Sequence, residues 1–250
     1  RLGGASYEGA QEGFRRYDTT WRYTDEARLL TFEAGDVLTG ALPWTSSVRV
    51  GGVQLSRDFA VRPDLVTYPL PQFAGEAAVP SSVDLFINGY KSDSALLQPG
   101  PYTLTNVPFI NGAGEAVVVT TDALGRQVST TVPFYVTSSL LQKGLTDFSV
   151  AAGSLSRDYT LKDFAYGPGV ASGTFRYGYS DNLTLESHAE ASSDLTLGGL
   201  GGNLRLGNFG VLNTAVSQSQ FEGRTGQQLS LGYQYNSTRY SLSYQRVERR

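Results

Sequence analysis

The chain has 250 residues, a formal net charge of −3 and no cysteine. The lack of cysteine excludes disulfides, thiolate chemistry and cysteine metal sites, and the small negative charge argues against a nucleic-acid binder. No apolar run approaches the ~18 residues that a transmembrane helix needs. With 29 glycines, 15 tyrosines and 12 phenylalanines, the composition favours short strands and turns, so an all-β protein is predicted.

The first part of the chain, residues 1–76, is predicted to contain amphipathic strands. We expect them at Asp18–Tyr23, Leu30–Ala34 and Val48–Leu55, with a turn at Asp25-Glu26 between the first two. Two prolines near the end of this part remove amide donors and fit poorly in a continuing central strand, so they mark a boundary.

The second part, residues 77–137, has a different pattern, with short strands separated by strong turn signals. Strands are expected at Val83–Ile87, Ala116–Thr120 and Gln127–Val132. Asn88-Gly89 follows the first of them and is a strong hairpin signal, because both residues tolerate positive φ. Short strands with turns at this density, over roughly 60 residues, predict a compact β-sandwich.

The third part, residues 138–250, returns to long alternating strands. In the run Gln228–Tyr235, apolar and small polar side chains take turns, and Arg239–Gln245 repeats the pattern after a turn. Such a ribbon separates an apolar medium from a polar one. A soluble antiparallel sheet over a core meets that condition, and so does a barrel wall between lipid and a water-filled lumen. The scarcity of Lys and Glu on the polar face and the aromatic residues near strand ends favour the barrel.

The barrel interpretation assigns each side chain of these strands to lipid or to the lumen. We therefore expect one transmembrane antiparallel β-barrel wall that includes the strands on both sides of the sandwich. The chain ends also lead us to expect a segment of a longer protein, because about ten strands would not close so wide a barrel. The side chains expected to face lipid are Leu183, Leu185, Leu229, Leu231, Tyr233, Leu242 and Tyr244, and those expected to face the lumen are Glu186, His188, Glu190, Ser230, Gln234, Ser241 and Ser243.

No residue pattern in the chain predicts catalysis or a cofactor. His188, the single histidine, stands between Glu186 and Glu190, but at ~3.3 Å per residue these two carboxylates lie ~13 Å apart. A lumen histidine is therefore favoured over a metal ligand. The glycine run Gly198–Gly202 superficially resembles a phosphate loop but lacks a following helix, so we expect it to bend a strand or to let another segment pass close to the wall. We predict no enzyme, no metal and no cofactor.

Two sets of charged residues have opposite signs and lie in different parts of the chain. One interpretation is that both are solvated surface charges. The other is that wall arginines hold sandwich carboxylates when a pore is closed. The candidates for such ion pairs are Arg15, Arg16, Arg22, Arg49, Arg57, Arg62, Glu76, Asp84, Asp93, Glu115 and Asp122.

Several stretches, in order and with matching spacing, resemble outer-membrane ushers of the chaperone–usher pilus (fimbrial) pathway. The resemblance covers essentially the whole chain. The stretches that carry it are Phe32–Asp36, Ser47–Leu55, Phe59–Asp64, Val83–Gly89, Pro99–Tyr102, Asp122–Arg126, Pro133–Val136 and Gly144–Val150.

This resemblance implies a β-barrel whose pore is closed by a plug, which is a sandwich inserted between two barrel strands and maps here to about residues 79–136. It also implies a gated channel of the bacterial outer membrane that secretes and assembles chaperone-delivered pilus subunits. The expected partners are periplasmic chaperone–pilin complexes, outer-membrane lipid and a second copy in a homodimer. A passive porin-like channel and a soluble β-sandwich adhesin remain as alternative interpretations.

Overall fold

The structure is a computed structural model that describes residues 2–7, 13–105, 111–156 and 166–250. These residues form β-strands and one short 3-10 helix, η1 (Phe59–Val61). No helix in the described ranges is long and apolar enough to cross a membrane. The predicted all-β class is confirmed.

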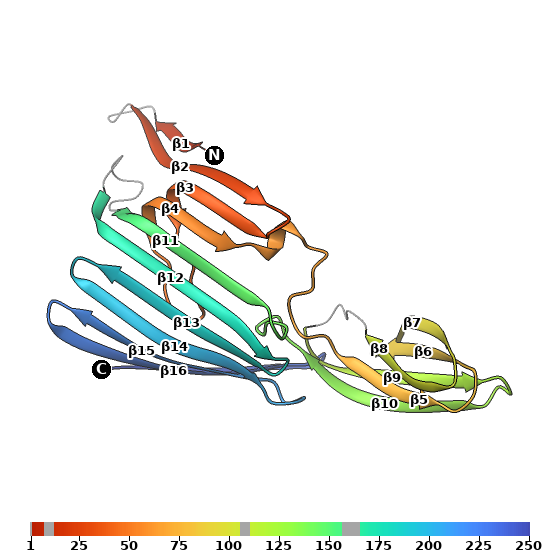
Figure 1. Ribbon diagram of the computed structural model, residues 1–250. Helices are drawn as coiled ribbons and strands as arrows, with labels where there is room; N and C mark the ends of the chain where they lie inside the picture. Colours follow the sequence, from red (N-terminus) through yellow and green to blue (C-terminus); the bar gives the residue numbers. More distant parts are fainter. Residues whose placement is uncertain (1, 8–12, 106–110, 157–165) are drawn as a thin grey trace.

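Eleven strands form one curved antiparallel sheet, which we call the wall (Figure 1). Its order is β1-β2-β3-β4-β11-β12-β13-β14-β15-β16-β17. The wall is open at both edges in these eleven strands. The bounds are β1 (Leu2–Tyr7), β2 (Gly13–Asp25), β3 (Leu30–Leu38), β4 (Arg49–Arg57), β11 (Thr146–Ser156), β12 (Tyr166–Ser180), β13 (Leu183–Ser192), β14 (Leu195–Arg205), β15 (Val211–Phe221), β16 (Arg224–Asn236) and β17 (Ser241–Arg249).

The wall continues directly across the point where the sandwich is inserted. Strand β4 pairs with β11 in antiparallel register, with Leu55 opposite Val150 and Gly51 opposite Ser154. The strands before and after the insertion are therefore neighbours in one sheet, which confirms the predicted topology. The last strand begins later than predicted, at Ser241, because Ser237 bonds to the carbonyl of Tyr240 and uses the intervening residues in a turn.

The inserted sandwich consists of a four-stranded sheet, β10-β9-β6-β7, packed on a two-stranded sheet, β5-β8. Its core includes Phe73, Val83, Leu85 and Phe134, all nearly inaccessible to solvent. Because β5 already pairs with β8, the sandwich begins before residue 77. Its strands are β5 (Gln72–Ala77), β6 (Ser81–Ile87), β7 (Tyr90–Leu97), β8 (Gly100–Thr105), β9 (Gly112–Asp122) and β10 (Gln127–Val136).

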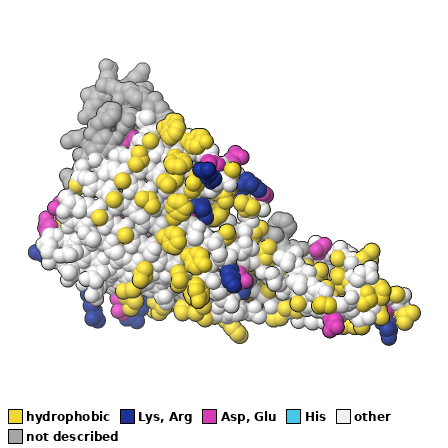
Figure 2. All heavy atoms as spheres, in the orientation of Figure 1, with side chains coloured by type: hydrophobic (Ala, Val, Ile, Leu, Met, Phe, Trp, Pro, Cys, Tyr) yellow, Lys and Arg dark blue, Asp and Glu magenta, His cyan; other side chains and the backbone are white. Residues whose placement is uncertain are grey.

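The wall exposes its apolar face and covers its polar face, which is the reverse of a water-soluble sheet that packs on an apolar core. Large apolar side chains are exposed on one face, with Leu200 66% exposed, while Glu186 on the other face is only 4% exposed. Figure 2 shows hydrophobic side chains spread over the wall, with charged ones gathered near its margins. The charged pair Arg246–Glu248 lies at the end of β17. An exposed apolar face opposite a polar one is the pattern of a barrel wall in lipid.

Candidate functional site

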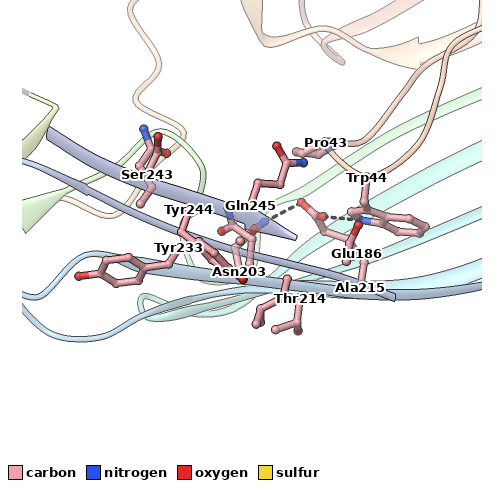
Figure 3. Close-up of a pocket in the computed structure, with 15 residues that line it drawn as sticks. Pro43, Trp44, Glu186, Asn203, Thr214, Ala215, Tyr233, Ser243, Tyr244 and Gln245 are labelled. Atoms are coloured by element: carbon pink, nitrogen blue, oxygen red, sulfur yellow. Dashed lines mark hydrogen bonds between the residues drawn. The ribbon is translucent and has the colours of Figure 1, made fainter. Parts of the chain in front are cut away.

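A loop folds back over the polar face of the wall. It comprises residues 39–48, between β3 and β4, and we call it the inner loop. Its base is closed by a bond from the Thr39 amide to the Val48 carbonyl, at 2.9 Å. At its tip, Trp44 Nε1 donates to Glu186 Oε2 on β13, at 3.0 Å, and the Trp44 carbonyl accepts from Gln228 on β16, at 3.2 Å. Figure 3 shows Trp44 pointing at Glu186. The inner loop thus reaches from β3 and β4 to β13 and β16.

Two glycines make room for the Trp44 indole. In the pairing of β13 with β14, Gly199 is opposite His188 and Gly201 is opposite Glu186. A Cβ on Gly199 would lie 2.7 Å from Trp44 Cζ3, and one on Gly201 would lie 2.8 Å from Trp44 Nε1. Real Cβ atoms do not approach that closely, so only glycine allows the indole to lie on the strand. The expectation that the glycine run lets another segment pass close to the wall is confirmed.

Glu186 is the centre of a buried polar network. Its Oε1 accepts from Arg176 Nε at 3.0 Å and from Asn203 Nδ2 at 2.7 Å, and its side chain is 1% exposed. Arg176 Nη2 also donates to the Ser139 carbonyl, at 2.6 Å, in the connection between β10 and β11. A buried carboxylate is tolerated when it is paired and hydrogen-bonded in this way. Glu186 therefore joins the inner loop, the wall and the connection that leads back from the sandwich.

His188 lies at the edge of this network. Its ring meets the Trp44 ring edge-on, with the centroids 6.2 Å apart and the planes at 89°. Nε2 is 3.7 Å from Glu190 Oε2, and Nδ1 is buried without a hydrogen-bond partner. The part of the chain that the structure describes has no group of three or more His, Asp or Glu side chains that could hold a metal ion.

Two connections, which we call the tethers, join the sandwich to the wall: residues 58–71 before it and residues 137–145 after it. They bond to each other where the Gln142 amide donates to the Thr67 carbonyl, at 2.7 Å. The second tether is also bound to the wall by the Leu141 amide, which donates to Thr184 Oγ1 at 2.8 Å. The sandwich itself lies beyond the ends of the wall strands (Figure 1). The two tethers therefore leave the wall side by side.

Three of the candidate arginines are held by groups close to them in the wall or the first tether. Arg22 pairs with Glu33 at 2.6 Å, and Arg62 pairs with Asp64 at 2.7 Å. Arg57 donates to Thr146 on the adjacent wall strand. Arg49 is the first residue of β4, and the side chains of Arg15 and Arg16 on β2 lie outside the described residues.

Two of the candidate carboxylates have ion-pair partners within the sandwich. Asp84 pairs with Lys91 at 2.8 Å, and the bond from Lys91 lowers the pKa of Asp84. Asp122 pairs with Arg126 at 2.7 Å, and bonds from the backbone and side chain of Arg126 lower the pKa of Asp122. The remaining candidates are also on sandwich strands, with Glu76 on β5, Asp93 on β7 and Glu115 on β9. With the sandwich in this position, no ion pair is seen between the described wall arginines and these carboxylates, so the closed-pore hypothesis stays a prediction.

The strand register shows which side chains share the polar face. Pairing through β14 and β15 aligns Glu186 on β13 with Ser230 on β16, and Gln234 on β16 pairs directly with Ser243 on β17. The residues expected to face the lumen, Glu186, His188, Glu190, Ser230, Gln234, Ser241 and Ser243, lie on this face, and Leu183, Leu185, Leu229, Leu231, Tyr233, Leu242 and Tyr244 lie on the other. That the polar face lines a lumen stays a prediction.

Comparison with known proteins relates this architecture to a family. The family described as "Outer membrane usher protein" matches residues 32–248. The chain belongs to this family. Membership confirms the resemblance found in the sequence, places this usher segment in the bacterial outer membrane and excludes the soluble adhesin.

Individual relatives agree with the assignment. The usher segment is 28% identical over 234 residues to the outer membrane usher protein YehB of Escherichia coli K12, covering 90% of this chain and 28% of that protein. It is 33% identical over 153 residues to PefC of Salmonella typhimurium, covering 60% of this chain and 19% of that protein. The chain thus spans 19–28% of the length of these relatives.

Solved structures support the fold. The P pilus usher PapC translocation pore aligns with a TM-score of 0.51 at 20% identity, covering 99% of this chain and 51% of that one. PapC in the P pilus tip assembly intermediate PapC-PapD-PapK-PapG of Escherichia coli aligns with a TM-score of 0.59 at 21% identity, covering 94% of this chain and 30% of that one. Together with the open eleven-stranded wall, this similarity identifies part of a β-barrel with an inserted sandwich.

Proposed function

We propose that the usher segment is the gated part of an outer-membrane channel and assembly platform, through which chaperone-delivered pilus subunits are secreted. The sandwich β5–β10 is the gate, or plug, and the polar face of the wall lines the pore. The chemistry is transport and assembly, without catalysis or a cofactor.

One observation carries this proposal: the sandwich is inserted between β4 and β11, which pair directly with each other. Because these two strands pair, the wall is continuous whether or not the sandwich fills the pore. The bond between Gln142 and Thr67 holds the two tethers together at the wall. The sandwich can therefore move as a unit without breaking the hydrogen-bond ladder of the barrel.

The sandwich also has the properties of an independent body. The buried residues of its core, among them Phe73, Val83, Leu85 and Phe134, all lie within residues 72–136, and Tyr68 of the first tether packs against them. Its carboxylates Asp84 and Asp122 pair with cations of the sandwich itself. Displacement therefore exposes no part of the core and leaves neither of these two ionised groups without its partner.

The partners are inferred from the family and from one solved assembly. That assembly contains the usher PapC with PapD, PapK and PapG in a pilus tip intermediate. We infer that this usher segment likewise acts on complexes of a periplasmic chaperone with pilus subunits, in contact with outer-membrane lipid and with a second copy as a dimer partner.

Cells that express the chaperone and subunits, with and without the full-length usher, test the secretion function. Without the usher, chaperone–subunit complexes should accumulate in the periplasm and no fibre should reach the surface. Expression of the intact usher should restore surface fibres, measured by electron microscopy and by labelling of whole cells. Surface fibres that form equally well without the usher would contradict the proposed function.

A further inference from the structure

We propose that the ends of β14 and β16, with the turn that follows β16, form a dock that holds the displaced sandwich outside the pore, and that Tyr135 is the residue it recognises. This inference rests on the proposed gating function and adds the device that keeps the channel open. The dock is built from Arg205, Tyr235, Asn236 and Tyr240.

Tyr135 lies near the end of β10, and the wall contacts it from three directions. Its ring stacks on Tyr235 with the centroids 5.9 Å apart and the planes at 29°, and Tyr235 in turn contacts Tyr240 at 5.7 Å. Its Oη accepts from the Asn236 amide at 3.2 Å, and its carbonyl accepts from Arg205 Nη1 at 3.1 Å. Tyr135 is 3% exposed. A sandwich side chain is thus buried by the wall.

The backbone of the sandwich fits the same surface. Gly112, at the start of β9, has a φ of +129° and lies against Asn236. A Cβ at Gly112 would lie 2.6 Å from the Asn236 carbonyl oxygen. Arg205 is itself held by two bonds to Asn182, at 2.7 and 2.9 Å, so its guanidinium is fixed before the sandwich arrives. The contact therefore fits on both sides, with Gly112 on the sandwich and the fixed Arg205 guanidinium on the wall.

The contact is also built to be released. A groove of about 690 Å³ lies between the sandwich and the wall beside Tyr135, lined by Ala113 and Phe134 on one side and by Ser237 and Leu242 on the other. Among the described residues, the hydrogen bonds, the ring stack and the Gly112 approach all lie at the ends of β9 and β10. An aromatic stack and a few hydrogen bonds without a dry core give a moderate affinity, which a reversible gate requires.

Cross-linking in the full-length usher tests the dock. Ala113→Cys and Ser237→Cys place one thiol on each side of the groove, and this segment has no other cysteine. A bis-maleimide should join them in a protein otherwise free of cysteine. Adding Tyr235→Ala should lower the yield by about two- to ten-fold, the range expected for one aromatic pair. The matched control Tyr244→Ala removes an aromatic ring from the wall that does not contact Tyr135, and it should leave the yield unchanged.

Conductance in planar bilayers distinguishes a failure of the dock proposal from a failure of the proposed gating function. The cross-linked channel should stay open, and Tyr235→Ala without cross-linker should lower the open probability, because the sandwich returns to the pore more often. A cross-linking yield that Tyr235→Ala does not change would overturn the dock. Cross-linking that responds to Tyr235→Ala but leaves the conductance unaltered would keep the dock and overturn the gating function.

Discussion

Gly199→Ala should release the inner loop from the wall without removing any group that binds it. The new Cβ would lie 2.7 Å from Trp44 Cζ3, about 0.7 Å inside ordinary van der Waals contact, and equally close to Ser217 Cβ on β15. A retreat of that size takes Trp44 Nε1, now 3.0 Å from Glu186 Oε2, beyond hydrogen-bond distance. The same change at Gly198 meets nothing within 4 Å, which makes Gly198→Ala the matched control.

The expected increase in the released form of the inner loop follows from the packing of Trp44. Overfilling a close contact costs ~1–3 kcal/mol, so the ratio of released to docked loop should rise about 5- to 150-fold. Hydrogen–deuterium exchange of peptides covering residues 39–48, in the full-length protein, measures this ratio directly. Faster exchange in Gly199→Ala than in the intact protein, with Gly198→Ala unchanged, is the expected result. Equal exchange in the two variants would refute the assigned role of the glycine slot.

Three further predictions concern the wall and the sandwich. Leu200→Arg places a charge in the exposed apolar face and should destabilise the barrel in lipid by ~2–4 kcal/mol, whereas Ser243→Arg on the polar face should be tolerated. Folding into vesicles, followed by the gel mobility of the folded form, compares the two variants. An equal loss of folded protein in both would refute the assigned orientation. Glu186→Gln leaves Arg176 without its buried partner and should cost ~3–5 kcal/mol, read as a lower unfolding temperature; an unchanged temperature would show that the pair contributes nothing. Hydrogen bonds from the backbone and then the side chain of Arg126 lower the pKa of Asp122 from its ordinary 3.8, so the ionised carboxylate stabilises the sandwich above pH 3.8 and this stabilisation is lost as the pH falls further. Hydrogen–deuterium exchange in the sandwich should therefore rise below pH 3.8, and Asp122→Asn should abolish that rise.

The sequence predicts the strands of the wall and their faces because alternation is a local signal. In β16, Leu229 and Leu231 alternate with Ser230, and the register carries this pattern to the neighbouring strands. The turn at Asn88-Gly89 was predictable for the same reason, since both residues have positive φ there, at 49° and 86°. The glycine run on β14 correctly indicated a close approach, although not the segment that makes it.

The rest of the site depends on contacts between residues far apart in the chain. Trp44 lies in a loop with no periodicity, and it is 142 residues away from Glu186 along the sequence. The proline at Pro43 and the glycines at Gly199 and Gly201 were the available signals. Tyr135 was missed because it lies near the end of a sandwich strand, where an aromatic residue predicts core packing and not a contact with the wall. The beginning of the sandwich at Gln72 was missed because β5 is short and follows two prolines.

Removing the sandwich tests the central claim, that it is the movable gate of the pore, most directly. The variant lacks Gln72–Val136 from the full-length usher and carries a short Gly/Ser bridge between the tethers, so β4 and β11 can still pair. Planar-bilayer recordings of this variant should show large and persistent conductance, because the proposed gate is gone. A folded variant that conducts no more than the intact usher would contradict the claim.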